Sequence, residues 1–406
     1  MSDKQFNLPR TGGDQSRLPW WAAFTFILVI LALSGCQPLV EAAPGEPQAA
    51  AFPETGPESG ESSLPAPTPF PTRPAYGPGE LVDYIAQTGD NLPILAIRFN
   101  TTVEEILEAN PIIPPNATTL PPGMPMRIPI YYRPFWGSPF QILPDSLFVN
   151  GPSQVEFDSD AFVEASPGWL KTYREYAAGA NRTGAEIVDY VAQNFSISPQ
   201  ILLALLDFQT GALSQDSLPQ FIDQTYPLGY RDRAHKDLYL QLVWAANFLN
   251  NGYYAWRTGN LTSLDLSDGT LEIPDPWQNA ATVALQYYFS QNFPKTDYQY
   301  ATGPDGLAST FQNLFQDPWE DVQPHIPGSL QQPYMLLPFE SGKTWAYTGG
   351  PHTGWGTGEP LAAIDFAPPS TASGCRASNE WNTAVAAGVV ARTDVGVLEL
   401  DLDGDG

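Results

Sequence analysis

Two residues near the C-terminal end of the sequence are of types that bind metal ions. His352 ends the stretch 343–352, and Asp365 lies inside the next stretch, 361–369. Both stretches are short and bounded by Gly and Pro, which predicts β-strands. A neutral imidazole and a carboxylate both suit a divalent ion of borderline softness. A third ligand would leave one position open for water, whose pKa then falls toward about 7.

Further short strands are predicted after Asp365, over residues 384–392 and 395–402. A His at the end of one strand, an Asp in the next and a following Val-Ala-Ala-Gly-Val-Val strand resemble the LytM and lysostaphin-type zinc endopeptidases. Those enzymes cut the peptide crosslinks of the bacterial cell wall. They hold zinc with a His, an Asp and a second His from a His-x-His pair, whose other His acts as base. The resemblance implies that His352 and Asp365 are zinc ligands.

The sequence departs from that family pattern at two points. His352 and Asp365 are further apart than in the family, so a loop over residues 354–359 must bulge out for the two side chains to meet. No His follows His352, and with two protein ligands zinc would bind weakly and no base would be placed. We therefore expect residues 331–406 to be the N-terminal part of a partial, antiparallel β peptidase domain. A lone Cys375 also favours truncation.

The two earlier histidines are predicted to stay outside any metal site. His235 lies in a charged stretch and is expected to be exposed, while His325 precedes Ile-Pro-Gly in a connector.

Residues 160–330 are predicted to form a helical domain, with apolar residues at helical spacing and a capping box at Thr183 and Glu186. The segment 197–211 is similar to the catalytic helix of soluble lytic transglycosylases, lysozyme-like enzymes that cleave peptidoglycan strands. Where that family has its general-acid Glu, this sequence has Gln209, and an amide cannot donate the proton that the leaving oxygen needs. Asp207 lies two residues before Gln209, so on a helix its side chain points about 200° away from that of Gln209 and is a poor substitute for the general acid. We expect a degenerate lysozyme-like domain, or else an unrelated helical bundle.

Residues 79–131 have a strand, helix, helix, strand pattern. Tyr84 and Ile85 begin an extended piece, two helix-spaced apolar segments follow, and Thr102 with Glu105 fits a capping box. In order and composition this stretch resembles a LysM domain, which implies a βααβ fold and a shallow groove for the glycan of peptidoglycan or chitin. The implied glycan-binding residues are Gly89, Asp90, Asn91, Leu92, Asn110, Pro111 and Ile112. Some of them also suit plain turn chemistry, and both roles can hold together.

The N-terminus is predicted to be an export signal. Basic residues precede the apolar run 20–33, and the run ends in Leu-Ser-Gly-Cys36, which resembles the lipobox of bacterial lipoproteins. We expect residues 1–35 to be a lipoprotein signal peptide and Cys36 to carry the membrane lipid, with an uncleaved membrane anchor as the alternative. Residues 36–78 are rich in Pro, Ala, Glu, Gly and Ser and are predicted to be a disordered tether.

Composition bounds the remaining possibilities. At 406 residues the chain has room for several domains, and its net charge of -26 offers no basic surface for nucleic acid. The predicted fold class is multidomain α+β: the βααβ module, a linker over residues 132–159, the helical middle domain and the partial β domain. The expected location is the cell envelope, with peptidoglycan as the partner.

Three hypotheses stay open at this point. The first is a lipid-anchored, peptidoglycan-binding protein of a zinc endopeptidase family, with crosslink cleavage in the complete protein. The second is a non-catalytic wall-binding or scaffold lipoprotein. The third is a glycosidase that acts through carboxylates of the acidic middle region.

Overall fold

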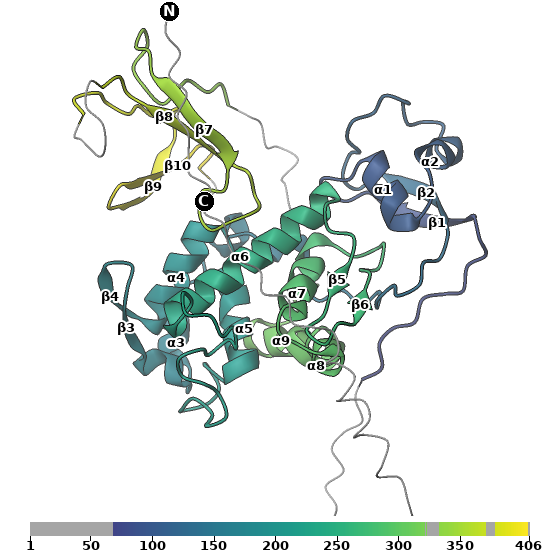
Figure 1. The fold of residues 1–406 in the computed structure, drawn as a ribbon, viewed down its shortest axis with the longest axis horizontal. Helices are drawn as coiled ribbons and strands as arrows, with labels where there is room; N and C mark the ends of the chain where they lie inside the picture. The colour runs from purple at the N-terminus through teal and green to yellow at the C-terminus, as the bar shows by residue number, and fades with distance from the viewer. Residues whose placement is uncertain (1–67, 321, 323–332, 371–377, 405–406) are drawn as a thin grey trace, which may run out of the picture. The chain divides into compact units, whose positions relative to one another are not determined.

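The computed structural model describes residues 68–320, 322, 333–370 and 378–404. In this part of the chain helices combine with five two-stranded antiparallel sheets, so the mixed α and β class is confirmed (Figure 1). The predicted signal peptide, nearly all of the tether, Cys36, His325 and Cys375 lie outside the described residues.

The predicted LysM module folds as βααβ. Its elements are β1 (Glu80–Ile85), α1 (Leu92–Phe99), α2 (Val103–Ala109) and β2 (Pro125–Ile130). The strands pair antiparallel, with Val82 opposite Ile128, and bury alternate residues against the two helices. The capping box at Thr102 and Glu105 is present, as predicted, and starts α2.

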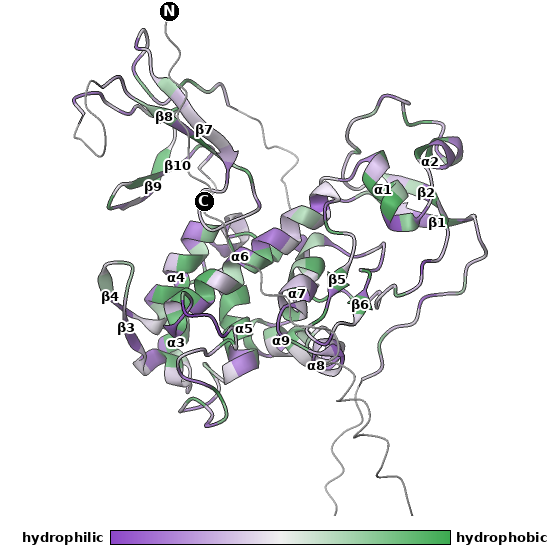
Figure 2. Cartoon of the chain, in the orientation of Figure 1, coloured by the Kyte–Doolittle hydropathy of each residue, from purple (hydrophilic) through white to green (hydrophobic). Residues whose placement is uncertain are grey.

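The middle of the chain is a helical domain with a single large core. Its α-helices are α3 (Ser159–Ala165), α4 (Gly184–Phe195), α5 (Pro199–Thr210), α6 (Asp237–Thr258), α7 (Ala280–Ser290), α8 (Lys295–Ala301) and α9 (Ser309–Phe315). Short helical turns occupy Asp145–Leu147, Pro152–Gln154, Trp169–Thr172 and Pro304–Ala308. Figure 2 shows α5 as largely hydrophobic and α4 as a mixture of hydrophobic and hydrophilic residues, and the hydrophobic residues of both helices lie in the core.

Local sequence explains where the central helices begin and end. The predicted capping box at Thr183 and Glu186 starts α4, and Pro199 occupies the first turn of α5. Gly211 and Gly259 end α5 and α6 in the left-handed conformation that glycine favours. On α6, Gly252 allows close packing against α7, because an added Cβ would lie 2.9 Å from Ala284 Cα.

Two hairpins interrupt the helical domain that the sequence predicted for residues 160–330. They are β3 (Arg174–Ala177) with β4 (Ala180–Thr183), and β5 (Leu264–Asp265) with β6 (Leu271–Glu272). The first turns through Ala178 and Gly179, both with positive φ, and the second through Asp268-Gly269. The first is a two-residue turn and the second a three-residue loop with Gly269 at positive φ, and both suit tight hairpins. The core itself remains mainly helical.

The LysM module packs on the helical domain through a buried charge and an aromatic cluster. Arg98 of α1 donates from Nη2 to the Trp256 carbonyl at 2.7 Å and stacks on the Trp256 ring. Trp277 meets Phe99 edge-on, with ring centroids 4.9 Å apart, and donates from Nε1 to the Asp83 carbonyl at 3.1 Å. These contacts fix the module on the ends of α6 and α7.

The C-terminal part forms two separate hairpins, as the predicted antiparallel strands require. They are β7 (Ala346–His352) with β8 (Ala363–Ala367), and β9 (Val389–Asp394) with β10 (Val397–Asp401). None of the described residues from 333 to 404 is fully buried. Within those described segments, the hairpins therefore have no hydrophobic core of their own.

Across the described part of the chain, none of the helices has both the length and the apolar character that a membrane span requires.

Candidate functional site

His352 and Asp365 meet at the end of the β7–β8 hairpin. The pairing places His352 opposite Ala363 and Gly349 opposite Asp365, with irregular register between them. His352 Nε2 lies 3.0 Å from Asp365 Oδ2, and both side chains are about half exposed. The structure thus brings together the two residues that the family resemblance singled out.

The other ring nitrogen of His352 is also fixed. Nδ1 lies 2.7 Å from the Thr353 carbonyl oxygen, which can only accept, so Nδ1 carries the proton. The Thr353 carbonyl first, and the Asp365 carboxylate second, raise the pKa of His352 above its ordinary value of 6.5. With Nδ1 held in this way, a neutral His352 directs the Nε2 lone pair at Asp365 Oδ2. A backbone acceptor on the second nitrogen is the usual support for a metal-binding imidazole.

The donor set fits two positions of a metal site. Nε2 and Oδ2 face one another across a distance that a shared cation could occupy after a small separation of the side chains. Within the described residues, however, there is no group of three His, Cys, Asp or Glu side chains that could hold a metal ion. A tightly bound zinc requires at least a third ligand.

His235 forms a second His–Asp pair, far from the first in sequence. Its Nδ1 lies 2.7 Å from Asp232 Oδ2, and its ring packs edge-on against Tyr230. The side chain is 31% exposed, so it is partly covered, whereas the sequence predicted an exposed side chain. The aspartate is three residues away in a turn, which makes this pair a local structural contact.

Gln209 and Asp207 both have structural partners. Gln209 Nε2 donates to the buried Tyr288 hydroxyl at 2.9 Å. Asp207 Oδ1 accepts from the backbone N–H groups of Leu213 and Ser214 and from the Ser214 hydroxyl, all within 2.9 Å. Asp207 therefore ties down the turn after α5, and neither residue is placed to protonate a glycosidic oxygen.

The predicted glycan-binding residues of the LysM module divide into two groups. Asp90 is buried and accepts from the Tyr84 hydroxyl and from Arg98 Nη1. Asn110 is also buried and joins α2 to β2 through three hydrogen bonds. Asn91 caps α1 and Leu92 belongs to the core, whereas Gly89, Pro111 and Ile112 are exposed. Ile112 has 86% of its surface exposed.

Comparison with known protein families matches two regions of the chain. Residues 84–129 match the family described as LysM domain, and residues 141–329 match the family described as LasA, N-terminal domain. The chain carries a LysM domain and a LasA N-terminal domain. The predicted LysM module is thereby confirmed. The middle region, from the turn before Asp145 to beyond α9, matches the second family.

Two curated relatives support the same assignment. They are named protease LasA, from the Pseudomonas aeruginosa strains UCBPP-PA14 and PAO1. Each is 25% identical over 234 residues, which cover 55% of this chain and 51% of the relative. The chain thus spans about half the length of these relatives and is a weak homologue of them. No solved structure gives a significant match.

The LasA N-terminal domain also holds the loop between His352 and Asp365. Asn247 Oδ1 accepts from the Thr357 backbone N–H at 2.6 Å, and Asn251 Oδ1 accepts from the Glu359 N–H at 2.7 Å. The two asparagines are four residues apart on α6 and so share one face of the helix. No local pattern in the sequence pairs these asparagines with a loop more than a hundred residues away.

Two glycines allow the loop to approach Asn247 and Asn251 closely. Gly356 and Gly358 both have positive φ, and a Cβ on either would lie 2.2 Å from an asparagine Oδ1. A second contact is made by Arg392 of β9, whose guanidinium donates to the side chains of Gln193 and Asn194 on α4.

Proposed function

We propose that this protein binds peptidoglycan in the cell envelope through its LysM domain and belongs functionally with cell-wall zinc endopeptidases. The observation that carries the proposal is the presence of a LysM domain and a LasA N-terminal domain on one chain. LysM domains bind the N-acetylated glycans of peptidoglycan and chitin. Protease LasA supplies the second half of the proposal, since it is a protease that resembles this chain over the matched region.

The exposed part of the LysM loops supports glycan binding. Gly89, Pro111 and Ile112 lie on the surface, while Asp90 and Asn110 hold the loops that present them. The exposed Ile112 side chain offers an apolar contact for the methyl group of an acetamido substituent. Backbone groups of the loops can pair with its N–H and C=O.

The His352–Asp365 pair supports a peptidase that uses zinc. When bound, the metal would supply a Lewis acid and a water of lowered pKa. The chain's own residues provide the rest. Thr353 fixes the tautomer of His352, β8 positions Asp365, and Asn247 with Asn251 holds the intervening loop. A third ligand and a base must come from side chains other than those that the structure brings to this pair.

Lipid anchoring belongs to the same proposal. The Leu-Ser-Gly-Cys36 sequence after an apolar run supports acylation of Cys36, and the Pro-rich residues 36–78 suit a tether between lipid and LysM domain.

Cosedimentation with purified peptidoglycan sacculi tests the binding half of the proposal. We expect the chain to sediment with sacculi, and Ile112→Ala to weaken binding by about 10-fold, since burying an Ile side chain contributes roughly 1.5 to 3 kcal/mol. Val155→Ala is the matched control, because Val155 is an exposed aliphatic residue outside the LysM domain. A chain that stays in the supernatant at every salt concentration would contradict the proposal.

The catalytic half needs a separate measurement. Release of free amino groups from sacculi, with and without added Zn²⁺, reports crosslink cleavage. Release that requires Zn²⁺ and is abolished in His352→Ala supports the peptidase. Binding without release favours the second candidate, a non-catalytic wall-binding scaffold.

A further inference from the structure

We propose that a second glycan subsite lies in the cleft between the LysM domain and the LasA N-terminal domain, where it takes an uncharged, N-acetylated sugar chain. This inference rests on the proposed function, because it extends the glycan that the LysM domain binds. None of the residues predicted from the sequence as glycan-binding lines this cleft.

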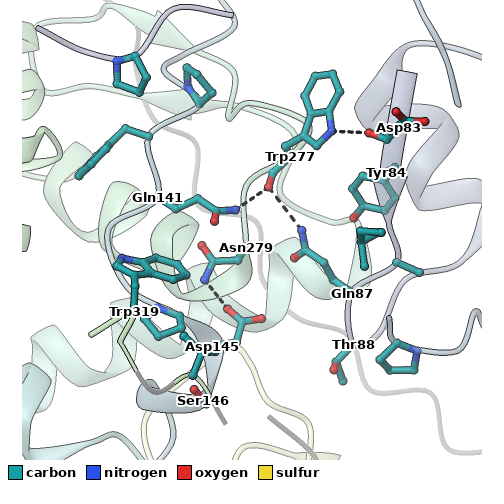
Figure 3. Close-up of a pocket in the computed structure, with 18 residues that line it drawn as sticks. Asp83, Tyr84, Gln87, Thr88, Gln141, Asp145, Ser146, Trp277, Asn279 and Trp319 are labelled. Atoms are coloured by element: carbon teal, nitrogen blue, oxygen red, sulfur yellow. Dashed lines mark hydrogen bonds between the residues drawn. The ribbon is translucent and has the colours of Figure 1, made fainter. Parts of the chain in front are cut away.

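The cleft is a cavity of about 890 Å³, drawn in Figure 3. One wall comes from the end of β1 and the turn after it, with Gln87 and Thr88. The opposite wall comes from the LasA N-terminal domain, with Gln141, Asp145 and Trp277, and Trp319 lies beside Asn279. A volume of this size is large enough for more than one sugar ring.

The charge of the lining selects against anionic ligands. Asp83 and Asp145 both border the cavity, and the described residues that line it include no Lys, Arg or His. A phosphate, a nucleotide or a polycarboxylate would meet the Asp145 carboxyl group in a lining without Lys, Arg or His, since the Arg127 that pairs with Asp83 at 3.1 Å is not part of the lining. A neutral ligand that forms many hydrogen bonds is therefore the better match.

Two glutamines and one asparagine line the cleft, and their amide oxygens are hydrogen-bond acceptors. Gln87 and Gln141 both use Nε2 to donate to the Trp277 carbonyl, at 3.4 and 2.9 Å. Their Oε1 atoms have no hydrogen-bond partner among the described residues. Asn279 Oδ1 is buried, without a partner in the described structure, while its Nδ2 donates to Leu143 and Asp145. Sugar hydroxyls and acetamido N–H groups are donors that the two partly exposed glutamine oxygens can accept from.

Two indole rings supply the apolar part of a sugar site. Trp277 is held rigidly by its hydrogen bond to Asp83 and its edge contact with Phe99. Trp319 is 40% exposed and stands at the opposite side of the cleft. Flat aromatic faces opposite amide groups give the combination of apolar contact and directed hydrogen bonds that a pyranose ring requires.

The cleft lies next to the LysM loop, so that one glycan chain can contact both the LysM groove and the cleft. Gln87 and Thr88 line the cleft, and the next residues are Gly89–Leu92 of the LysM loop. Both belong to one turn, closed by hydrogen bonds between Gln87 and Asp90. A glycan that leaves the LysM groove at Gly89 thus enters the cleft within a single turn of the backbone.

Binding of N-acetylglucosamine oligomers by calorimetry tests this inference on the full chain. The disaccharide and the hexasaccharide are compared for wild type, Trp319→Ala, Trp319→Tyr and Ile112→Ala. Trp381→Ala is the matched control, since Trp381 is an exposed tryptophan that does not line the cleft. We expect Trp319→Ala to weaken hexasaccharide binding roughly 3- to 10-fold, the effect of one lost aromatic contact. Trp319→Tyr should restore most of it.

The outcomes separate this inference from the proposed function. If Trp319→Ala leaves hexasaccharide affinity unchanged while Ile112→Ala weakens it, the second subsite is overturned and the LysM function stands. If the wild-type chain binds neither oligomer, both fail. A Trp319→Ala loss that is confined to the longer oligomer, with an unchanged melting temperature, supports the subsite.

Discussion

His352 Nε2 and Asp365 Oδ2 lie 3.0 Å apart, although 13 residues separate them along the chain. The β7–β8 pairing brings the two strands together, and the intervening loop is held on α6 by Asn247 and Asn251. The loop that joins the two residues is therefore held in part by contacts outside the hairpin. Predictions follow for both the pair and the loop.

Removing either member of the pair should weaken divalent metal binding. We expect His352→Ala and Asp365→Ala each to lower the affinity for Zn²⁺ by at least about 10-fold, because even supporting residues around a metal contribute that much. His235→Ala is the matched control, since it removes a similar His–Asp pair elsewhere. Calorimetric titration of Zn²⁺ into the three variants checks this. Equal affinities in all three would show that the metal does not bind at His352.

The loop contact can be broken at a glycine. Gly358→Ala places a Cβ 2.2 Å from Asn251 Oδ1 and also strains a backbone with φ of +92°. We expect residues 353–359 to exchange amide hydrogens about 10-fold faster, as expected when a hydrogen bond worth about 1.4 kcal/mol is lost. Asn251→Ala separates the two causes, because it removes the same hydrogen bond from the Glu359 N–H without straining the backbone at Gly358. If Asn251→Ala leaves exchange in residues 353–359 unchanged, the asparagine contact does not hold this loop.

Local sequence predicted the LysM elements and the central helices, because capping residues and apolar spacing act within a few residues. Thr102 with Glu105 and Thr183 with Glu186 are examples, and both capping boxes form. The short hairpins were missed, since strands of two to four residues carry too little alternation to be recognised.

The parts of the site that depend on distant residues could not be predicted. The family resemblance singled out His352 and Asp365, but nothing local pairs Asn247 with Thr357. The cleft residues Gln87, Gln141 and Trp319 come from separate segments that only the packed fold brings together. Conversely, the burial of Asp90 shows that a residue in a binding loop can serve mainly to hold that loop.

Asp90 and Ile112 should therefore respond differently to substitution. Asp90→Asn removes the carboxylate that pairs with the buried Arg98 at 2.9 Å, so we expect a loss of about 3 kcal/mol or more in the free energy of unfolding. Ile112→Ala should change that free energy by less than about 0.5 kcal/mol, because the side chain is exposed. Urea unfolding of both variants measures the difference. A stable Asp90→Asn variant with lost glycan binding would instead assign Asp90 a direct role.

Gln209 should matter for stability and not for glycan chemistry. Gln209→Ala leaves the buried Tyr288 hydroxyl without its partner, which is expected to cost about 1 to 2 kcal/mol. Sacculus binding should be unchanged, and neither wild type nor variant should produce new reducing ends. Sugar release by the wild type that disappears in Gln209→Ala would revive the glycosidase hypothesis.

Asp145 should make stability depend on pH in an unusual direction for an aspartate. Its Oδ1 accepts from the Ala281 N–H at 2.8 Å at the start of α7, yet burial, the largest influence, raises the pKa of its carboxyl above 3.8. A raised pKa in the folded state means that the protonated form is favoured there. The stability that this group contributes is complete below about pH 3.8 and is lost as the pH rises through the folded-state pKa.

Asp145→Asn keeps an oxygen acceptor for Ala281 and removes the charge. We therefore expect the variant to gain in free energy of unfolding relative to wild type as the pH rises from about 4 to about 7, measured by urea unfolding at each pH. A difference between the two proteins that stays constant with pH would show that Asp145 does not titrate differently on folding.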